Sequence, residues 1–256
     1  MNSSLAQLKS ALARRQDQTA PLRLFFRDDD VDEDEATLRR LLQFFLRRET
    51  PINLGVIPGR LTAAGGELLA QSVSDAPALL ELNQHGWRHL NHELVGRKLE
   101  FGPGRTFAEQ MSDIAQGQAR MTEAFGPHWF PVFIPPWNRC VEDTYRALDQ
   151  LGFRALSAKQ GNSVVTGYRF REISITLDLY RWQGGARMKP SEEIVGDLIA
   201  QLSRQQTIGV MLHHKVMDES AFSFLGFLLD ALAAHSIVHF HTFQSLVQLS
   251  DETPQV

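Results

Sequence analysis

Three consecutive aspartates, Asp28 to Asp30, follow the apolar segment LRLFF and Arg27. Adjacent carboxylates repel one another and are costly to remove from water unless a cation, a proton or hydrogen bonds compensate their charge. Aspartates are also ordinary turn and helix-capping residues, so the run by itself equally describes a solvated loop. Its meaning depends on which other polar side chains the fold brings to the same place.

Two histidine clusters carry side chains that bind metals or transfer protons. His85 and His89 stand four residues apart in QHGWRHLNHE, so on a helical turn they would share a face and could hold one metal ion, with His92 as a reserve ligand. His213 and His214 end the apolar run GVML. Because side chains alternate along a strand, we expect at most one of that pair to face a shared site.

Two further segments carry weaker signals. In FIPPWNRC, Pro136 stiffens the backbone, Trp137 offers a flat apolar wall suited to a sugar face, and Arg139 adds a polar group. In LDLYRWQGGAR, Asp178 and Trp182 follow an apolar run. Rigid loops and single aspartates near strand ends are common. These two segments therefore indicate a functional site only if the fold places them near Asp28 to Asp30 and the histidine clusters.

The elements that must position these residues alternate along the chain. Helical patterns lie between most of the apolar runs, and the run TFAEQ opens with Thr106 and Glu109 at capping-box spacing. This order predicts a parallel α/β sheet, closed or open, in which ligands bind at the carboxyl ends of the strands. We expect strands at 22–27, 52–58, 78–83, 131–134, 154–157, 173–178, 208–213 and 236–240.

One aspartate and two histidines form a three-ligand set that leaves positions open for water. This is the composition expected of a catalytic divalent site, zinc above all. A second aspartate beside the ligand is a candidate general base, and a histidine at the end of strand 208–213 is a candidate general acid.

Composition excludes several other classes of protein. The 256 residues carry a net charge of -4, and no basic patch argues for nucleic acid. One cysteine excludes a disulfide framework. The stretch 1–20 lacks the apolar core of a secretion signal and no segment is apolar enough to span a membrane. We expect an N-terminal helix over 1–20, a single domain over 21–256 and a cytoplasmic protein, while the sequence leaves the oligomeric state open.

The clusters together resemble the polysaccharide deacetylase (NodB-homology) superfamily, and most closely its divergent deacetylase-like branch. FRDDD, HGWRH, FIPPWNR, DLYRW and MLHH stand in the order of that family's TFDDG-like, H[ST]xxH, RPPY-like, DxxxW-like and LxH-like motifs. The five motifs extend from Phe26 to His214. The resemblance implies a distorted (β/α) barrel of about seven or eight strands.

The resemblance leaves two registers open at the aspartate run. Aligned on the TFDDG form, Asp28 is the base and Asp29 the metal ligand. Aligned on an RxDD form, Asp29 is the base and Asp30 the ligand, and we prefer this second register.

The other roles follow the remaining motifs. His85 and His89 resemble the family's metal-binding histidines, and His213 resembles its general acid, with Asp178 as the residue that orients it. The implied cofactor is a divalent metal, most readily zinc, with cobalt, nickel or manganese as alternatives. The residues expected to contact the substrate are Arg27, Pro136, Trp137, Arg139, Trp182 and His214.

The implied reaction is the hydrolysis of an acetyl or other acyl group from an N-acetylated sugar or polysaccharide. The chain departs from the family because Gly86 replaces a serine or threonine and Ile134 replaces the arginine that pairs with the catalytic aspartate. Arg27 or Arg139 is a candidate substitute for that arginine. Two alternatives stay open, namely a catalytically silent glycan- or metabolite-binding relative and a hydrolase of a small non-sugar amide.

Overall fold

A curled parallel sheet forms the centre of the molecule. The computed structural model describes residues 2–15, 20–161 and 167–251. The sheet has the strand order β6-β5-β4-β3-β2-β1-β10-β7, with β11 paired to β1, and all of these pairs are parallel. Its strands are β1 (Leu22–Val31), β2 (Ile52–Val56), β3 (Leu80–His85), β4 (Trp129–Ile134), β5 (Ala155–Leu156), β6 (Arg171–Glu172), β7 (Leu177–Asp178), β10 (Thr207–Leu212) and β11 (Val238–Phe240).

One extended segment joins the two ends of this sheet. β6 pairs with β5 and β7 pairs with β10, and only four residues separate β6 from β7. Along the way Ile175 N donates to Ala158 O at 2.8 Å and Thr176 N donates to Gly209 O at 3.0 Å. The sheet therefore closes on itself as a distorted (β/α) barrel, which confirms the predicted fold class. A small hairpin, β8 (Tyr180–Arg181) with β9 (Arg187–Met188), lies outside it.

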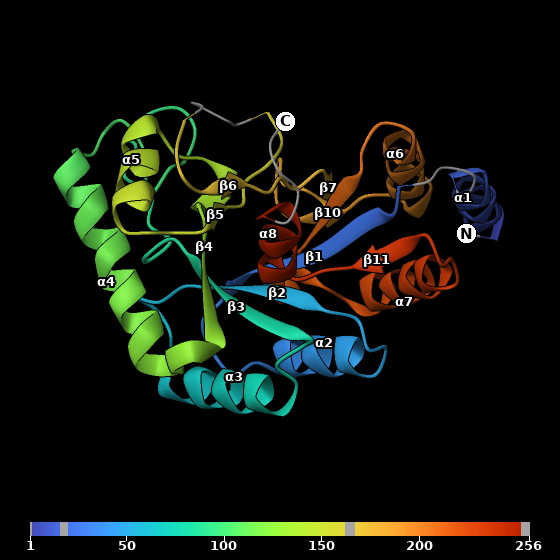
Figure 1. Ribbon diagram of the computed structural model, residues 1–256, viewed down its shortest axis with the longest axis horizontal. Helices are drawn as coiled ribbons and strands as arrows, with labels where there is room; N and C mark the ends of the chain where they lie inside the picture. Colours follow the sequence, from blue (N-terminus) through green and yellow to red (C-terminus); the bar gives the residue numbers. More distant parts are fainter. Residues whose placement is uncertain (1, 16–19, 162–166, 252–256) are drawn as a thin grey trace.

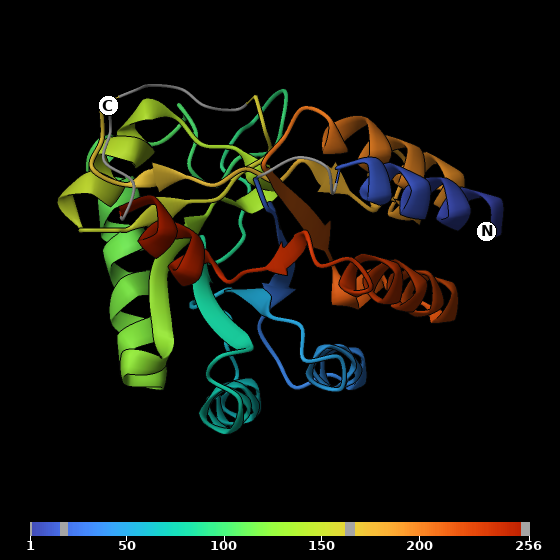
Figure 2. The same cartoon turned by 45° about the vertical axis from the view of Figure 1, so that its right-hand side comes forward.

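Helices cover the outside of the barrel (Figure 1). In both views α1 lies beside α6, and its Leu8 and Leu12 are fully buried (Figure 2). Thr106 and Glu109 form the predicted capping box at the start of α4. No described helix is long and apolar enough to cross a membrane. The helices are α1 (Asn2–Arg15), α2 (Ala36–Leu46), α3 (Ala63–Asp75), α4 (Phe107–Phe125), α5 (Glu142–Gln150), α6 (Ser191–Leu202), α7 (Glu219–Ala233) and α8 (Phe243–Asp251), with short 3-10 turns η1 (Gly126–His128), η2 (Pro136–Asn138) and η3 (His214–Val216).

The interior of the barrel has its own small core. It contains inward residues of β1, β4 and β10, such as Phe25, Ile134 and Met211, together with Phe243 and Val247 of α8. Outward residues of the same strands pack instead against the helices. Helix α8 therefore closes the interior at the amino-terminal end of the strands and leaves the carboxyl end for polar side chains.

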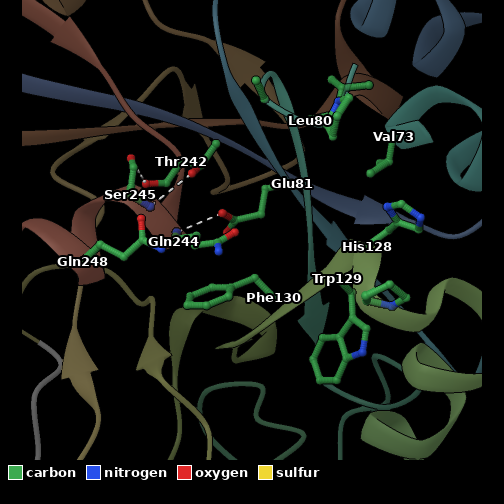
Figure 3. A pocket seen from close by; sticks show the side chains of 13 residues that line it. Val73, Leu80, Glu81, His128, Trp129, Phe130, Thr242, Gln244, Ser245 and Gln248 are labelled. Atoms are coloured by element: carbon green, nitrogen blue, oxygen red, sulfur yellow. Dashed lines mark hydrogen bonds between the residues drawn. The ribbon is translucent and has the colours of Figure 1, made fainter. Parts of the chain in front are cut away.

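Buried polar groups attach α8 to the strands. Asn53 Oδ1 accepts from the backbone N–H of Phe243 at 2.8 Å. Glu81 Oε2 accepts from the backbone N–H of Gln244 at 2.8 Å (Figure 3). Asn83 donates to the other oxygen of Glu81 at 2.9 Å. Glu81 is only 5% exposed, and this burial outweighs its hydrogen bonds and raises the pKa of its carboxyl group to about 7. Glu81 belongs to a pocket of about 330 Å³ at the end of the barrel opposite the predicted site.

We predict that Glu81 makes the protein less stable as the pH rises from about 4.5 to about 7. In this window the folded state holds a proton that the unfolded state has released, so the free energy of unfolding falls with rising pH, by about 3 kcal/mol in total. Urea unfolding of the wild type and of Glu81→Gln at pH 4.5 and 7.5 measures the effect. Glu81→Gln keeps an acceptor and loses the titration, so its pH dependence should be weaker, and identical pH dependences would contradict the prediction.

Candidate metal centre and active site

The end of β1 brings two consecutive aspartates to the same side of the sheet. The pairing of β1 with β2 matches Asp28 to Leu54 but Val31 to Val56, so β1 contains one extra residue. Asp30 has the left-handed φ of 70°, a conformation that aspartate tolerates better than most residues. This bulge breaks the strict alternation of side chains, and both Asp29 and Asp30 line one cavity.

Asp30, His85 and His89 converge on a point. The distance from Asp30 Oδ1 to His85 Nε2 is 3.2 Å, and the distance to His89 Nε2 is also 3.2 Å. One ligand atom from each side chain lies within 4.8 Å of the others. The structure thus brings together the three residues that we expected to bind metal. His92 is exposed and lies outside this group.

The two histidines meet by a route that the sequence did not suggest. His85 is the last residue of β3, and His89 lies in the following loop with a φ of 57°, so the expected helical turn between them is wrong. Buried Glu100 shapes this loop by accepting from the backbone N–H groups of Trp87 at 3.1 Å and Arg88 at 2.7 Å. Trp137 packs its ring 4.4 Å from that of His89.

Gly86 suits the same loop for a steric reason. Its φ is 59°, and a Cβ atom there would lie 2.2 Å from Glu100 Oε2. A serine or threonine at this position would displace the carboxylate that holds the loop. The glycine at position 86 therefore leaves space for the carboxylate of Glu100. Our sequence analysis did not identify Glu100.

The electrostatics of Asp30 and His89 favour metal binding. Burial of His85 is instead outweighed by the charges of Asp29 and Asp30, which raise the pKa of His85. Burial raises the pKa of Asp30, but its hydrogen bond to His85 and the nearby histidine charges outweigh this and hold the pKa below the usual value. Burial and the neighbouring His85 lower the pKa of His89 to about 4. An ionised carboxylate and a neutral imidazole are the forms that bind metal ions.

Arg27 and Asp29 form an ion pair inside the barrel. Arg27 Nη2 donates to Asp29 Oδ2 at 2.8 Å and to Asn138 Oδ1 at 2.6 Å, while Nη1 donates to the backbone and side-chain oxygens of Ser157. Arg27 is 0% exposed and Asp29 is 2% exposed. Arg27 therefore provides the cation that Ile134 cannot, and of our two candidates it is the one that reaches the aspartate. The other oxygen of Asp29, Oδ1, is buried without a hydrogen-bond partner among the described residues.

Asp28 and His214 lie on the other side of β1, away from the cavity. His214 donates its backbone N–H to Asp28 Oδ1 at 2.8 Å, and its Nδ1 lies 2.6 Å from Oδ2. Both side chains are fully buried, and neither lines the cavity. Strand alternation explains this, because Asp28 stands between the inward residues Arg27 and Asp29. The geometry therefore does not support the expectation that Asp28 is the base or the expectation that His214 contacts the substrate.

His213 faces the cavity from the end of β10. Its ring lies 4.4 Å from that of Trp182 in an edge-on arrangement, and its Nδ1 is buried without a partner in the described part of the chain. Asp178 accepts from the indole N–H of Trp182 at 2.9 Å and from Tyr180 N at 2.9 Å. Asp178 therefore positions Trp182, and Trp182 in turn packs against His213, so the orienting role that we expected of Asp178 would act through Trp182.

The cavity has a volume of about 600 Å³ and lies at the carboxyl ends of the strands. Of the residues expected at the substrate, Trp137, Arg139 and Trp182 line it, while Arg27, Pro136 and His214 do not. Asn138 of the FIPPWNRC segment also lines it, and the lining residues that sequence reasoning missed are Arg97, Lys159, Gln160, Gln183 and Met211. Met211 belongs to β10 and the other four lie in segments that follow strands, but nothing in their residue types marked them out.

The single cysteine lies near this site, but its thiol is unreactive. Cys140 follows Arg139 and precedes α5. Burial, followed by the charge of Glu172, raises the pKa of its thiol to about 12. The thiol is therefore neutral at ordinary pH and is a poor nucleophile.

The donor set fits a divalent metal. Asp30, His85 and His89 offer one oxygen and two nitrogens, which is typical of catalytic zinc and also suits cobalt, nickel or manganese. The partnerless Asp29 Oδ1 and His213 Nδ1 border the same cavity, as expected where a ligand would complete the hydrogen bonding.

Comparison with solved structures identifies the fold class. No family model and no curated protein matches the chain. A protein from Mycobacterium smegmatis assigned as a polysaccharide deacetylase matches with a TM-score of 0.67 and 16% identity, over 93% of this chain and 96% of that one. A family 4 acetyl xylan esterase from Clostridium thermocellum in complex with cobalt matches with a TM-score of 0.62 and 14% identity, over 90% and 92%.

A peptidoglycan N-acetylglucosamine deacetylase matches with a TM-score of 0.58 and 12% identity, over 88% of each chain. The chain therefore has the NodB-type barrel fold that these deacetylases and esterases share. This confirms, at the level of the fold, the resemblance seen in the sequence.

We predict that purified protein binds about one divalent ion per chain and that the double variant His85→Ala/His89→Ala loses it. Removing two of three ligands leaves a single carboxylate, which cannot hold the ion alone. Metal analysis after dialysis against zinc measures the stoichiometry, with His92→Ala as the matched control because His92 lies outside the group. Full occupancy in the double variant would contradict the assignment.

Proposed function

We propose that the protein is a metal-dependent hydrolase that removes an acetyl or other acyl group from an N-acetylated sugar or polysaccharide. The observation that carries this proposal is the convergence of Asp29, Asp30, His85, His89 and His213 on one cavity at the carboxyl ends of the barrel strands. A fold shared with deacetylases and acetyl esterases supports the reaction class.

The proton acceptor in this mechanism is Asp29. A divalent ion held by Asp30, His85 and His89 would supply Lewis acidity, polarising the acyl carbonyl and making nearby water easier to deprotonate. Asp29 accepts the proton of the attacking water through Oδ1, the oxygen that has no partner among the described residues. Arg27 holds the other oxygen at 2.8 Å and so fixes which oxygen faces the cavity.

The proton donor is His213. It faces the cavity and contacts Trp182, which Asp178 holds in place. His213 donates a proton to the leaving amine as the bond between carbon and nitrogen breaks. The backbone N–H of Trp137 is our candidate for a hydrogen bond to the developing oxyanion.

Two tryptophans provide the apolar walls for a sugar. Trp182 is 45% exposed, and Trp137 is half-buried against His89. Their rings lie at the cavity from loops after different strands, so a sugar ring entering between them would be held by both faces.

The main test compares variants of the proposed acid and base. We expect Asp29→Asn and His213→Ala to lower acetate release from N-acetylated sugar oligomers by roughly a hundredfold or more, since each removes one proton-transfer group. Metal content should be retained in the His213 variant. His214→Ala should act mainly on stability, because it leaves the buried Asp28 carboxylate without its partner.

We would measure thermal unfolding and acetate release on both the His213→Ala and the His214→Ala protein. The two measurements distinguish a catalytic role from a role in stability. A larger catalytic loss in the His214 variant, with metal bound, would reverse their roles.

A separate prediction concerns Cys140. Since its thiol stays protonated and does not line the cavity, Cys140→Ser should retain acetate release within about twofold of the wild type. Loss of turnover with intact fold and metal would mean that the chemistry proceeds through the thiol instead.

A panel of acylated sugars and small acylated amines distinguishes this function from hydrolysis of a non-sugar amide. The absence of an arginine at Ile134 favoured the alternative that the protein binds a glycan or metabolite without catalysis. Arg27 pairs with Asp29 in place of that arginine, so this argument for the alternative is weaker.

A further inference from the structure

Three basic side chains form one wall of the cavity, which we call the basic wall: Arg97, Arg139 and Lys159. They lie in the segments that follow β3, β4 and β5, which are neighbours in the sheet. Asp178 lines the cavity as the last residue of β7, and Trp182 and His213 line it from the segments that follow β7 and β10. The cavity is therefore polarised, with its cations on the β3–β5 side.

The basic wall is not neutralised by the protein. Within the described residues, no hydrogen bond or ion pair joins the side chain of Arg97, Arg139 or Lys159 to another side chain. Many exposed arginines, such as Arg39 and Arg40, pair with carboxylates instead. Burial, and then the charge of Arg97, lower the pKa of Arg139, so these two like charges influence one another. Holding unpaired like charges together costs free energy, which a bound anion would recover.

Each carboxylate that lines the same cavity has partners other than the basic wall. Asp29 is paired with Arg27, and Asp178 accepts from Trp182 and Tyr180. Asp30 belongs to the candidate metal centre. Asp178 keeps its negative charge but lies on the β7–β10 side, and none of the three carboxylates forms an ion pair with the basic wall in the described part of the chain. The β3–β5 side of the cavity therefore attracts negative charge although the whole chain has a net charge of -4.

We propose that the substrate carries an anionic group, a carboxylate or a phosphate, which binds the basic wall while the acylated amine lies at the candidate metal centre. This inference rests on the proposed function and narrows its substrate class to acidic N-acylated sugars. Arg139 is the principal contact, because it is half-buried and its planar guanidinium group can bind two oxygens at once. Arg97 and Lys159 are exposed and add attraction from the rim.

Binding of three related sugars tests the proposal. The probes are N-acetylglucosamine, which is neutral, N-acetylglucosamine 6-phosphate, and N-acetylmuramic acid, which carries a carboxylate. Titration of the zinc-loaded protein, followed by its tryptophan fluorescence, should show at least one anionic probe binding roughly tenfold more tightly than the neutral sugar. The better anionic probe identifies which acidic group the wall accepts.

Variants assign the preference to the basic wall rather than to the metal. Arg139→Gln and Lys159→Gln should each reduce the preference for the anionic probe several-fold while metal content is unchanged. Arg47→Gln removes the same charge from an exposed residue at the carboxyl end of α2, outside the cavity, and should keep the full preference.

The inference is overturned if neither anionic probe binds more tightly than the neutral sugar, or if the two wall variants keep the preference as Arg47→Gln does. Acetate release, measured on the same probes, separates this result from the proposed function. Hydrolysis without an anionic preference contradicts only the inference, whereas an anionic preference without hydrolysis of any acylated sugar contradicts the proposed function.

Discussion

A buried positive charge inside the barrel is the constraint around which the site is built. Arg27 is fully buried, and its guanidinium group bonds to Asp29 on its own strand, to Asn138 after β4 and to Ser157 after β5. Removing one partner of such a pair typically costs about 3–5 kcal/mol, because the other charge is left uncompensated. The side chain therefore fixes Asp29 and ties together segments that follow separate strands. The interior apolar core and α8 close the amino-terminal end and keep water from this pair on that side.

A second constraint is the bulge at the end of β1. A regular strand would turn Asp29 and Asp30 to opposite faces, and only one of them could reach the cavity. The extra residue and the left-handed backbone of Asp30 place a proton acceptor and a candidate metal ligand side by side. The strain is tolerable because the residue is an aspartate and because two histidines hold its carboxylate at 3.2 Å.

The fold class and most strand positions were predictable, because apolar runs are local properties of a sequence, but β6, β8 and β9 were not predicted and the strand expected at 173–178 is only Leu177–Asp178. Strand alternation predicted that at most one of His213 and His214 faces the cavity, and the motif resemblance indicated His213. The bulge at Asp30, the loop that carries His89 and the part played by Glu100 were not predictable, since each depends on contacts between distant segments. The choice between Arg27 and Arg139 needed the structure for the same reason. Spacing predicted that His85 and His89 lie close together, which the structure confirms, but the helical turn that we expected is absent from the described segment between them.

Three adjacent aspartates are stable here because each one faces different partner side chains. Asp28 points outward to His214, Asp29 points inward to Arg27, and Asp30 turns away on the bulge to His85 and His89. Burial alone would lower the pKa of His214, and the charge and hydrogen bond of Asp28 raise it instead, which shows how closely that outer pair is coupled. The mutual repulsion of the three carboxylates is thus offset in three separate directions. The run is therefore not a redundant cluster of acids: its members hold the strand end, accept a proton and bind metal in the mechanism that we propose, and strand geometry prevents them from exchanging these parts.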